Sequence, residues 1–167
     1  MNIFYLSEYA DEAAEFHCDK HVNKMIMETV QMMSTAHREL DGDEWADSVG
    51  LVKRTHVNHP STKWVRSGVH NYVWMLELLT NLCQEKRKRW PNNAPHQYEK
   101  FIDILSVIPD NMPDEPFTAP PQCMTDDCKH FDTVIAYRKF YHKDKPFAEW
   151  KYTQAPVWWK GYLYDYS

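Results

Sequence analysis

One polar stripe on a predicted helix carries the residues that are best suited to chemistry. His21, Lys24 and Glu28 recur at three- and four-residue intervals, and Gln31 and Thr35 continue the same spacing. In a helix this spacing places all five side chains on one face. A lysine amine can act as a nucleophile, while a histidine or a glutamate can move protons. The stripe therefore predicts an amine-based active site, and the alternative interpretation is a solvated face with a Lys24–Glu28 ion pair.

The beginning of the same helix extends this candidate site. Asp19 and Lys20 stand at its amino-terminal edge, where free backbone N–H groups favour anions. We expect Lys20 or Lys24 to supply the amine and Glu28 to act as the acid and base. His21 and His59 are predicted to transfer protons. The predicted catalytic residues are thus Lys20, His21, Lys24, Glu28 and His59.

A second candidate is the basic segment of residues 53–66, which surrounds a predicted helix start. It combines four cationic residues, two histidines, a tryptophan and several hydroxyl groups. This combination favours phosphate binding beside a ring that can stack on a base. Arg54, Lys63 and Arg66 are predicted to hold phosphates, and Trp64 is predicted to stack. The alternative interpretation is a capped helix start with scattered surface charge.

The sequence gives little support for a metal or an organic cofactor. His17 and His21 are four residues apart, as in helical metal pairs, but no HExxH motif accompanies them. Cys123, Cys128 and His130 bring together two thiols and an imidazole without an evident fourth zinc ligand. A glycine-rich phosphate loop is also missing, which argues against Walker-type hydrolysis and Rossmann dinucleotide binding. We therefore expect no cofactor and ordinary loop residues at these cysteines.

Helical periodicity dominates the elements that must position these residues. Only 4 Gly accompany 10 Pro, a composition that disfavours a turn-rich β-sandwich or barrel. An extended lead-in is expected over residues 1–6, and five prolines predict an irregular loop over 109–128. The sequence thus predicts an all-α, compact single-domain helical bundle over residues 1–167. We expect its helices over residues 7–18, 19–38, 60–67, 69–90, 96–107 and 131–142.

Helix ends and the aromatic tail carry further expectations. Ser7 is the predicted N-cap of the first helix, and Pro60 stands at the first position of another. The basic run of residues 86–89 is typical of a solvated helix end. The tail is rich in rings, which predict either a segment packed over the core or a stacking platform. These rings are Trp158, Trp159, Tyr162, Tyr164 and Tyr166.

Charge and hydropathy narrow the possible partners. Lys and Arg total 19 against 24 Asp and Glu, giving a net charge of -5. This balance argues against a general nucleic-acid coating protein, although it permits a local basic patch. No apolar run approaches the roughly 18 residues of a membrane-spanning helix, and the first residues lack a signal-peptide pattern. We expect a cytoplasmic protein with reduced thiols and no membrane partner.

Four segments resemble one known family. They are LSEYADEAAEFH, THVNHPSTKW, the long helix with its basic end, and APVWWKGYLYDY. Together they are similar to the phage pyrimidine-dimer DNA glycosylases of the endonuclease V type. THVNHPSTKW and PFTAPPQCM also resemble unassigned proteins of large tailed phages. The resemblance implies a compact all-helical domain, damaged DNA as the partner, and residence in the host cell cytoplasm.

The same resemblance implies a chemical mechanism. In that family an amino-terminal amine attacks the sugar and forms an imine, and a glutamate on the first helix assists β-elimination without a metal. The family's nucleophile needs a small second residue, whereas this chain has Asn2. The amine is then that of Met1 or of a lysine such as Lys20 or Lys24. The predicted function is a DNA base-excision enzyme of the glycosylase/abasic-site lyase type.

Two alternatives remain open. A nucleotide- or base-modifying enzyme on a related helical scaffold would suit the low net basicity. A non-enzymatic phage protein could instead bind a host factor through the aromatic tail and the proline-rich loop.

Overall fold

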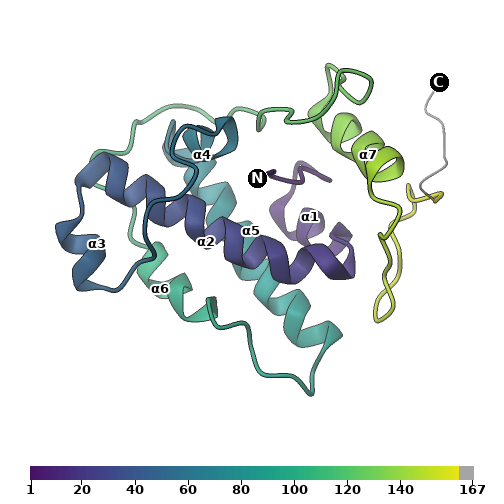
Figure 1. Cartoon of the computed structure of the whole chain (residues 1–167), viewed down its shortest axis with the longest axis horizontal. Helices are drawn as coiled ribbons and strands as arrows, with labels where there is room; N and C mark the ends of the chain where they lie inside the picture. Colours follow the sequence, from purple (N-terminus) through teal and green to yellow (C-terminus); the bar gives the residue numbers. More distant parts are fainter. Residues whose placement is uncertain (162–167) are drawn as a thin grey trace.

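Two long helices form the frame of the structure, a computed structural model that describes residues 1–161 (Figure 1). They are α2 (Asp19–Asp41) and α5 (Val69–Arg89), which pack across each other. The described residues contain seven α-helices, one 3-10 helix and no strand, so the all-α prediction is confirmed. The shorter elements are α1 (Ala10–Phe16), α3 (Glu44–Ser48), α4 (Pro60–Val65), η1 (Glu99–Phe101), α6 (Ile102–Leu105) and α7 (Thr133–Asp144).

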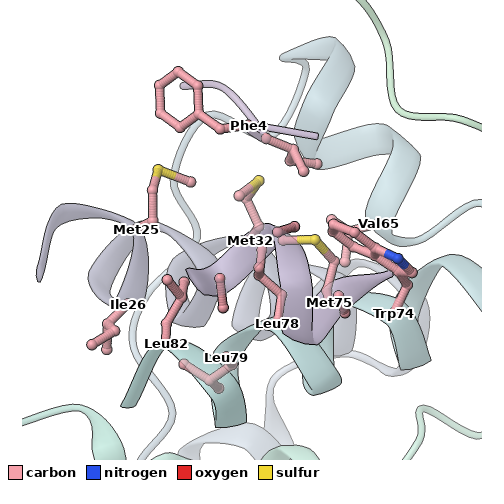
Figure 2. Packing of buried hydrophobic residues seen from close by; sticks show 14 of the residues in the cluster. Phe4, Met25, Ile26, Met32, Val65, Trp74, Met75, Leu78, Leu79 and Leu82 are labelled. Atoms are coloured by element: carbon pink, nitrogen blue, oxygen red, sulfur yellow. The ribbon is translucent and has the colours of Figure 1, made fainter. Parts of the chain in front are cut away.

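The core lies between the facing sides of α2 and α5. Met25 and Met32 of α2 are buried against Leu78 and Leu82 of α5 (Figure 2). These apolar residues recur every three or four positions, so each helix turns one stripe inward. Flexible methionines fill the irregular gaps between branched side chains. The predicted division at Gly68 is also present, because α4 and α5 lie on either side of it.

Residues 1–6 form the extended lead-in that the sequence predicts, and most of it is buried. The Phe4 ring stacks on the His21 ring with 4.2 Å between centroids. At the other end, Ser61 Oγ donates to the Met1 carbonyl over 3.5 Å. The segment therefore runs from the first turn of α2 to the start of α4, and it links two regions that carry predicted catalytic residues.

Several predicted boundaries are wrong for local reasons. Ser7 does not cap α1: its hydroxyl donates to Glu12 (2.8 Å), and the helix begins only at Ala10. The expected helix over 96–107 is confined to η1 and α6. There the His96 ring accepts the Tyr98 N–H over 3.0 Å and holds residues 96–98 in a turn. In addition, α3 forms between the expected helices over residues 19–38 and 60–67, where no helix was expected.

The basic run at the end of α5 is solvated only in part. Arg89 is buried, and its guanidinium donates to the carbonyls of His17 (2.7 Å) and Glu15 (2.9 Å). It also pairs with Glu85 at 2.9 Å and with Asp19 at 3.3 Å. Carbonyls at the end of α1 lack partners within their own helix, so Arg89 satisfies them. This contact fixes the point at which α2 begins.

The aromatic tail packs over α7, which lies at the opposite end of the molecule from α3 (Figure 1). Trp159 stacks on His142 at 4.9 Å, and Trp158 meets Phe16 edge-to-face at 5.9 Å. The predicted packing of these two tryptophans over the core is thus confirmed. Tyr162, Tyr164 and Tyr166 lie outside the described residues. Over residues 1–161, no helix combines the length and apolar character needed to cross a bilayer.

Candidate active site

Three lysines gather where the first turns of α2 meet the end of α7. We call Lys20, Lys24 and Lys145 the lysine cluster. The ammonium of Lys145 lies 4.5 Å from the Phe140 ring centroid, and that of Lys20 lies 4.5 Å from Phe147. The positive charges of all three lysines act on His21. The structure thus brings together Lys20, His21 and Lys24 of the predicted catalytic set and adds Lys145.

Aromatic rings form the floor of this site. His21 is 1% exposed, is stacked on Phe4, and meets Phe147 edge-on at 5.6 Å. Phe147 is 40% exposed, so one face of the floor reaches solvent. Ammonium groups over aromatic faces are stabilised by the ring quadrupole. The same rings also shield the ammonium groups from water, and burial opposes the charged form.

Acidic partners are missing around the lysine cluster. Within the described part of the chain, no carboxylate lies within ion-pair distance of Lys20, Lys24 or Lys145. The Lys24–Glu28 ion pair of the alternative interpretation therefore does not form. Burial and the nearby charge of Lys24 lower the pKa of the Lys145 amine. Three uncompensated cations form a site that favours an anion.

His21 is a buried, neutral imidazole whose ring orientation is fixed by Tyr141. The Cys18 N–H donates to the Tyr141 hydroxyl oxygen over 3.4 Å. The Tyr141 hydroxyl is hydrogen-bonded to His21 Nδ1 over 2.7 Å, and this contact fixes the orientation of the ring. Burial first, followed by the charges of His17 and the lysine cluster, lowers the pKa of His21 to about 2. This environment suits a neutral hydrogen-bond donor better than the predicted proton-transfer role.

Glu28 lies one turn beyond Lys24, about 6 Å along the helix axis. Its side chain is half-buried, and its Oε2 atom is buried without a hydrogen-bond partner among the described residues. A buried carboxylate oxygen without a partner is unfavourable, and such groups are concentrated where a protein binds or transforms a ligand. Glu28 is thus available as the acid and base that the sequence predicts.

His59 lies at the other end of segment 1–6 from the lysine cluster. It is the N-cap of α4, where its Nδ1 accepts the Ser61 N–H over 3.1 Å. Burial, the charge of the Met1 amino group and the charge of His56 lower its pKa. The structure therefore gives His59 a capping role next to Met1, and it does not place the ring among the lysines.

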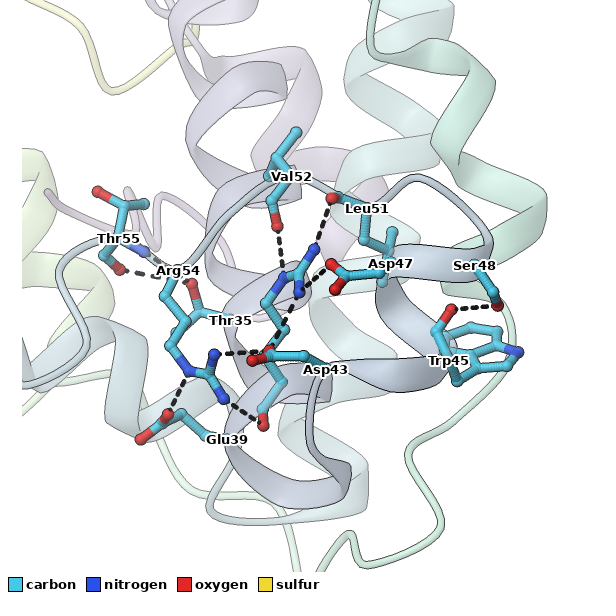
Figure 3. A network of polar contacts seen from close by, with 11 residues as sticks. Thr35, Glu39, Asp43, Trp45, Asp47, Ser48, Leu51, Val52, Arg54 and Thr55 are labelled. Carbon is cyan, nitrogen blue, oxygen red and sulfur yellow. Dashed lines mark hydrogen bonds and ion pairs between the residues drawn. The ribbon is translucent and has the colours of Figure 1, made fainter.

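The predicted phosphate-binding residues are largely occupied by structural contacts. Arg54 pairs with Glu39 (2.7 Å) and Asp43 (2.6 Å) and also donates to the Arg38 carbonyl (Figure 3). In this arrangement each of its three nitrogens already has an acceptor. Arg38, beside it, is buried against Asp47 and the carbonyls of residues 51 and 52. This network fixes α3 against the end of α2.

The other three residues of that set lie around α4. Trp64 is 7% exposed, and its indole N–H donates to Thr118, so its ring faces have little access to a base. Arg66 donates to the Val57 carbonyl over 2.9 Å. Lys63 is exposed. The structure thus does not assemble these residues into one phosphate surface, and their binding roles stay predictions.

The candidate metal ligands of the sequence are His17, His21, Cys123, Cys128 and His130. Over residues 1–161, no group of three or more histidine, cysteine, aspartate or glutamate side chains is placed to hold a metal ion. Cys123 Sγ lies 3.5 Å from Ser61 Oγ, whereas Cys128 is buried. The backbone of His130 is bound on both sides by the Gln122 amide.

Lys145 and Phe147 are the site residues that sequence reasoning missed. They lie beyond α7, in a short segment with no periodicity, more than a hundred residues from the stripe on α2. The local signal was two lysines followed closely by an aromatic residue in Lys-Asp-Lys-Pro-Phe, residues 143–147. Comparison with protein-family models, curated proteins and solved structures finds no match to this chain. The resemblance to pyrimidine-dimer glycosylases thus stays a prediction.

Proposed function

We propose that this protein acts on DNA through an amine of the lysine cluster, as a base-excision enzyme of the glycosylase/abasic-site lyase type. One observation carries the proposal. Three lysine ammonium groups, none of them ion-paired with a carboxylate of residues 1–161, act on a neutral histidine that lies on an aromatic floor. An amine among other cations loses its proton more readily, and the same cations attract a phosphate backbone.

On an abasic site the proposed reaction proceeds through an imine. The neutral amine adds to the C1′ aldehyde of the sugar, and water leaves as the imine forms. A base then removes a proton from C2′, and the electrons of that bond expel the 3′-phosphate oxygen. Hydrolysis of the imine restores the amine. On an intact nucleotide, the protonated base leaves from C1′ in place of water.

The remaining residues have separate roles in this proposal. Glu28, whose Oε2 has no partner among the described residues, is the base for the C2′ proton. We assign the histidine proton to Nε2, with the Tyr141 hydroxyl donating to Nδ1, so that His21 directs Nε2–H toward developing negative charge without changing its own protonation state. Phe147, the exposed ring beside Lys20, offers a face on which the flipped base can stack.

A second candidate is a small anionic nucleotide as the substrate. Two observations favour it, namely the net charge of -5 and the occupation of Arg54 and Trp64 by structural contacts. A duplex requires an extended phosphate-binding surface, whereas one nucleotide requires only the lysine cluster. This alternative predicts that small nucleotides raise the melting temperature of the protein and that the protein does not bind DNA.

Borohydride trapping on an oligonucleotide with one abasic site tests the proposal. We expect a covalent protein–DNA adduct whose yield falls strongly in Lys24→Met, because a cation is removed from the cluster. Lys53→Met is the matched control. Lys53 lies beside Arg38, about 21 Å along α2 from Lys24, so its adduct yield should match that of the unchanged protein. If correctly folded protein forms no adduct, the proposal fails.

A further inference from the structure

Lys145 differs from the other two members of the lysine cluster in its burial. Lys20 and Lys24 are exposed on α2, whereas Lys145 is half-buried after the end of α7. Its ammonium group lies 4.5 Å from the Phe140 centroid and 5.9 Å from that of Phe4. The Lys145 amine is therefore the one that aromatic carbon shields most from water.

Burial and the like charge of Lys24 favour the uncharged form of the Lys145 amine. From α2, Lys24 presents a like charge, and His21 is neutral. Segment 1–6 contributes the ring of Phe4, and α7 contributes the ring of Phe140. The opposing groups are Asp144, the adjacent residue, and the Cys18 thiol, and their effects are smaller than those of burial and Lys24. Burial and a neighbouring cation are the two means by which proteins make a lysine nucleophilic at neutral pH.

We propose that Lys145 is the reactive amine of the site, and that it forms an imine with aldehydes that carry a phosphate group. The neutral Nζ adds to the carbonyl carbon, the carbonyl oxygen takes up two protons and leaves as water, and a C=N bond remains. The exposed Lys20 and Lys24 hold the phosphate. For its natural substrate the inference rests on the proposed function. The open-chain sugar of an abasic site is an aldehyde that carries phosphate groups.

Pyridoxal 5′-phosphate combines an aldehyde and a phosphate and is the probe for this test. The full chain is mixed with a limiting amount at neutral pH and reduced with borohydride, and the labelled peptides are mapped by mass spectrometry. We expect Lys145 to be labelled several times faster than Lys143. Lys143 is the matched internal control because it lies two residues away, at the end of the same helix, and pairs with Asp127 at 3.6 Å.

Two variants complete the experiment. Lys145→Arg keeps the positive charge but has no nucleophilic amine, so the main adduct should disappear while the circular dichroism spectrum stays unchanged. Lys143→Met should retain the adduct on Lys145. Equal labelling of Lys24 and Lys145, or labelling spread evenly over exposed lysines, would overturn the inference.

The same experiment separates this inference from the proposed function. Selective labelling of Lys145 together with no trapping on abasic DNA would support the reactive lysine and remove the DNA lyase activity. Trapping on abasic DNA at Lys20 or Lys24, with Lys145 unlabelled, would retain the activity and overturn the assignment of its amine.

Discussion

Arg89→Met should destabilise the fold much more than the same substitution two residues earlier. The Arg89 side chain is 0% exposed and binds Glu85, Asp19 and two backbone carbonyls. Methionine retains the apolar stem but leaves two mostly buried carboxylates and two carbonyls without this donor. Removing one partner of a buried ion pair typically destabilises a protein by about 3–5 kcal/mol.

Arg87→Met provides the matched control on the same helix. Arg87 is 58% exposed and pairs with Glu99 at 2.6 Å. Exposed pairs contribute about 0–1 kcal/mol, because water already solvates both charges. The two substitutions remove the same group, and the expected difference of about 2–5 kcal/mol reflects the burial and the additional partners of Arg89.

Urea unfolding, followed by tryptophan fluorescence and far-ultraviolet circular dichroism, measures this difference. With a slope of about 2 kcal/mol per molar urea, the midpoint should fall by about 2 M for Arg89→Met. It should fall by less than about 0.5 M for Arg87→Met. Similar midpoints for the two variants would refute the claim that Arg89 anchors the start of α2.

Three further predictions concern other parts of the structure. The free energy of unfolding should fall as the pH drops below 6.5, because burial lowers the pKa of His17 to about 4 and that of His21 to about 2, whereas both histidines take up a proton in the unfolded chain. By pH 5 each histidine should reduce the free energy of unfolding, measured with urea, by about 2 kcal/mol. An unchanged free energy of unfolding from pH 7 to 5 would contradict this prediction. Tyr141→Phe should destabilise by about 1–3 kcal/mol and lower the trapping yield, because His21 Nδ1 loses its donor; a fully active variant would exclude the tautomer assignment. Arg54→Met should destabilise by only about 1 kcal/mol, since its ion pairs are partly exposed, and should leave nucleotide binding unchanged in a thermal-shift titration; lost binding would restore its predicted phosphate role.

The two long helices of the fold could be predicted because the sequence pattern of a helix depends on residues that are close together in the chain. The apolar stripe of α2 repeats over many turns of the helix. Gly68 and Pro60 mark helix boundaries through their own backbone preferences, which do not depend on tertiary contacts. The polar stripe likewise predicted that Lys20, His21 and Lys24 lie on one helix. The aromatic tail was expected either over the core or beside the site, and Trp158 and Trp159 pack over the core.

The tertiary partners of these elements were not predictable from one sequence. Arg89 belongs to a basic run of the kind that usually ends a helix in solvent. It is buried because it binds backbone carbonyls at the end of α1. Trp64 and Arg54 are residue types that often form nucleic-acid-binding surfaces. In this structure the Trp64 indole N–H donates to Thr118, and the Arg54 guanidinium donates to Asp43. Lys145 joins the site through a contact that no periodicity encodes. Each of these differences depends on contacts between segments that are distant in sequence.

The most direct measurement is borohydride trapping of the full chain on an oligonucleotide with one abasic site, followed by peptide mapping of the adduct. The central claim is that the lysine cluster supplies a nucleophilic amine, and it predicts one adduct whose modified residue is Lys145. An adduct confined to Met1, or to a lysine outside the cluster such as Lys63, would contradict the claim, as would folded protein that forms no adduct.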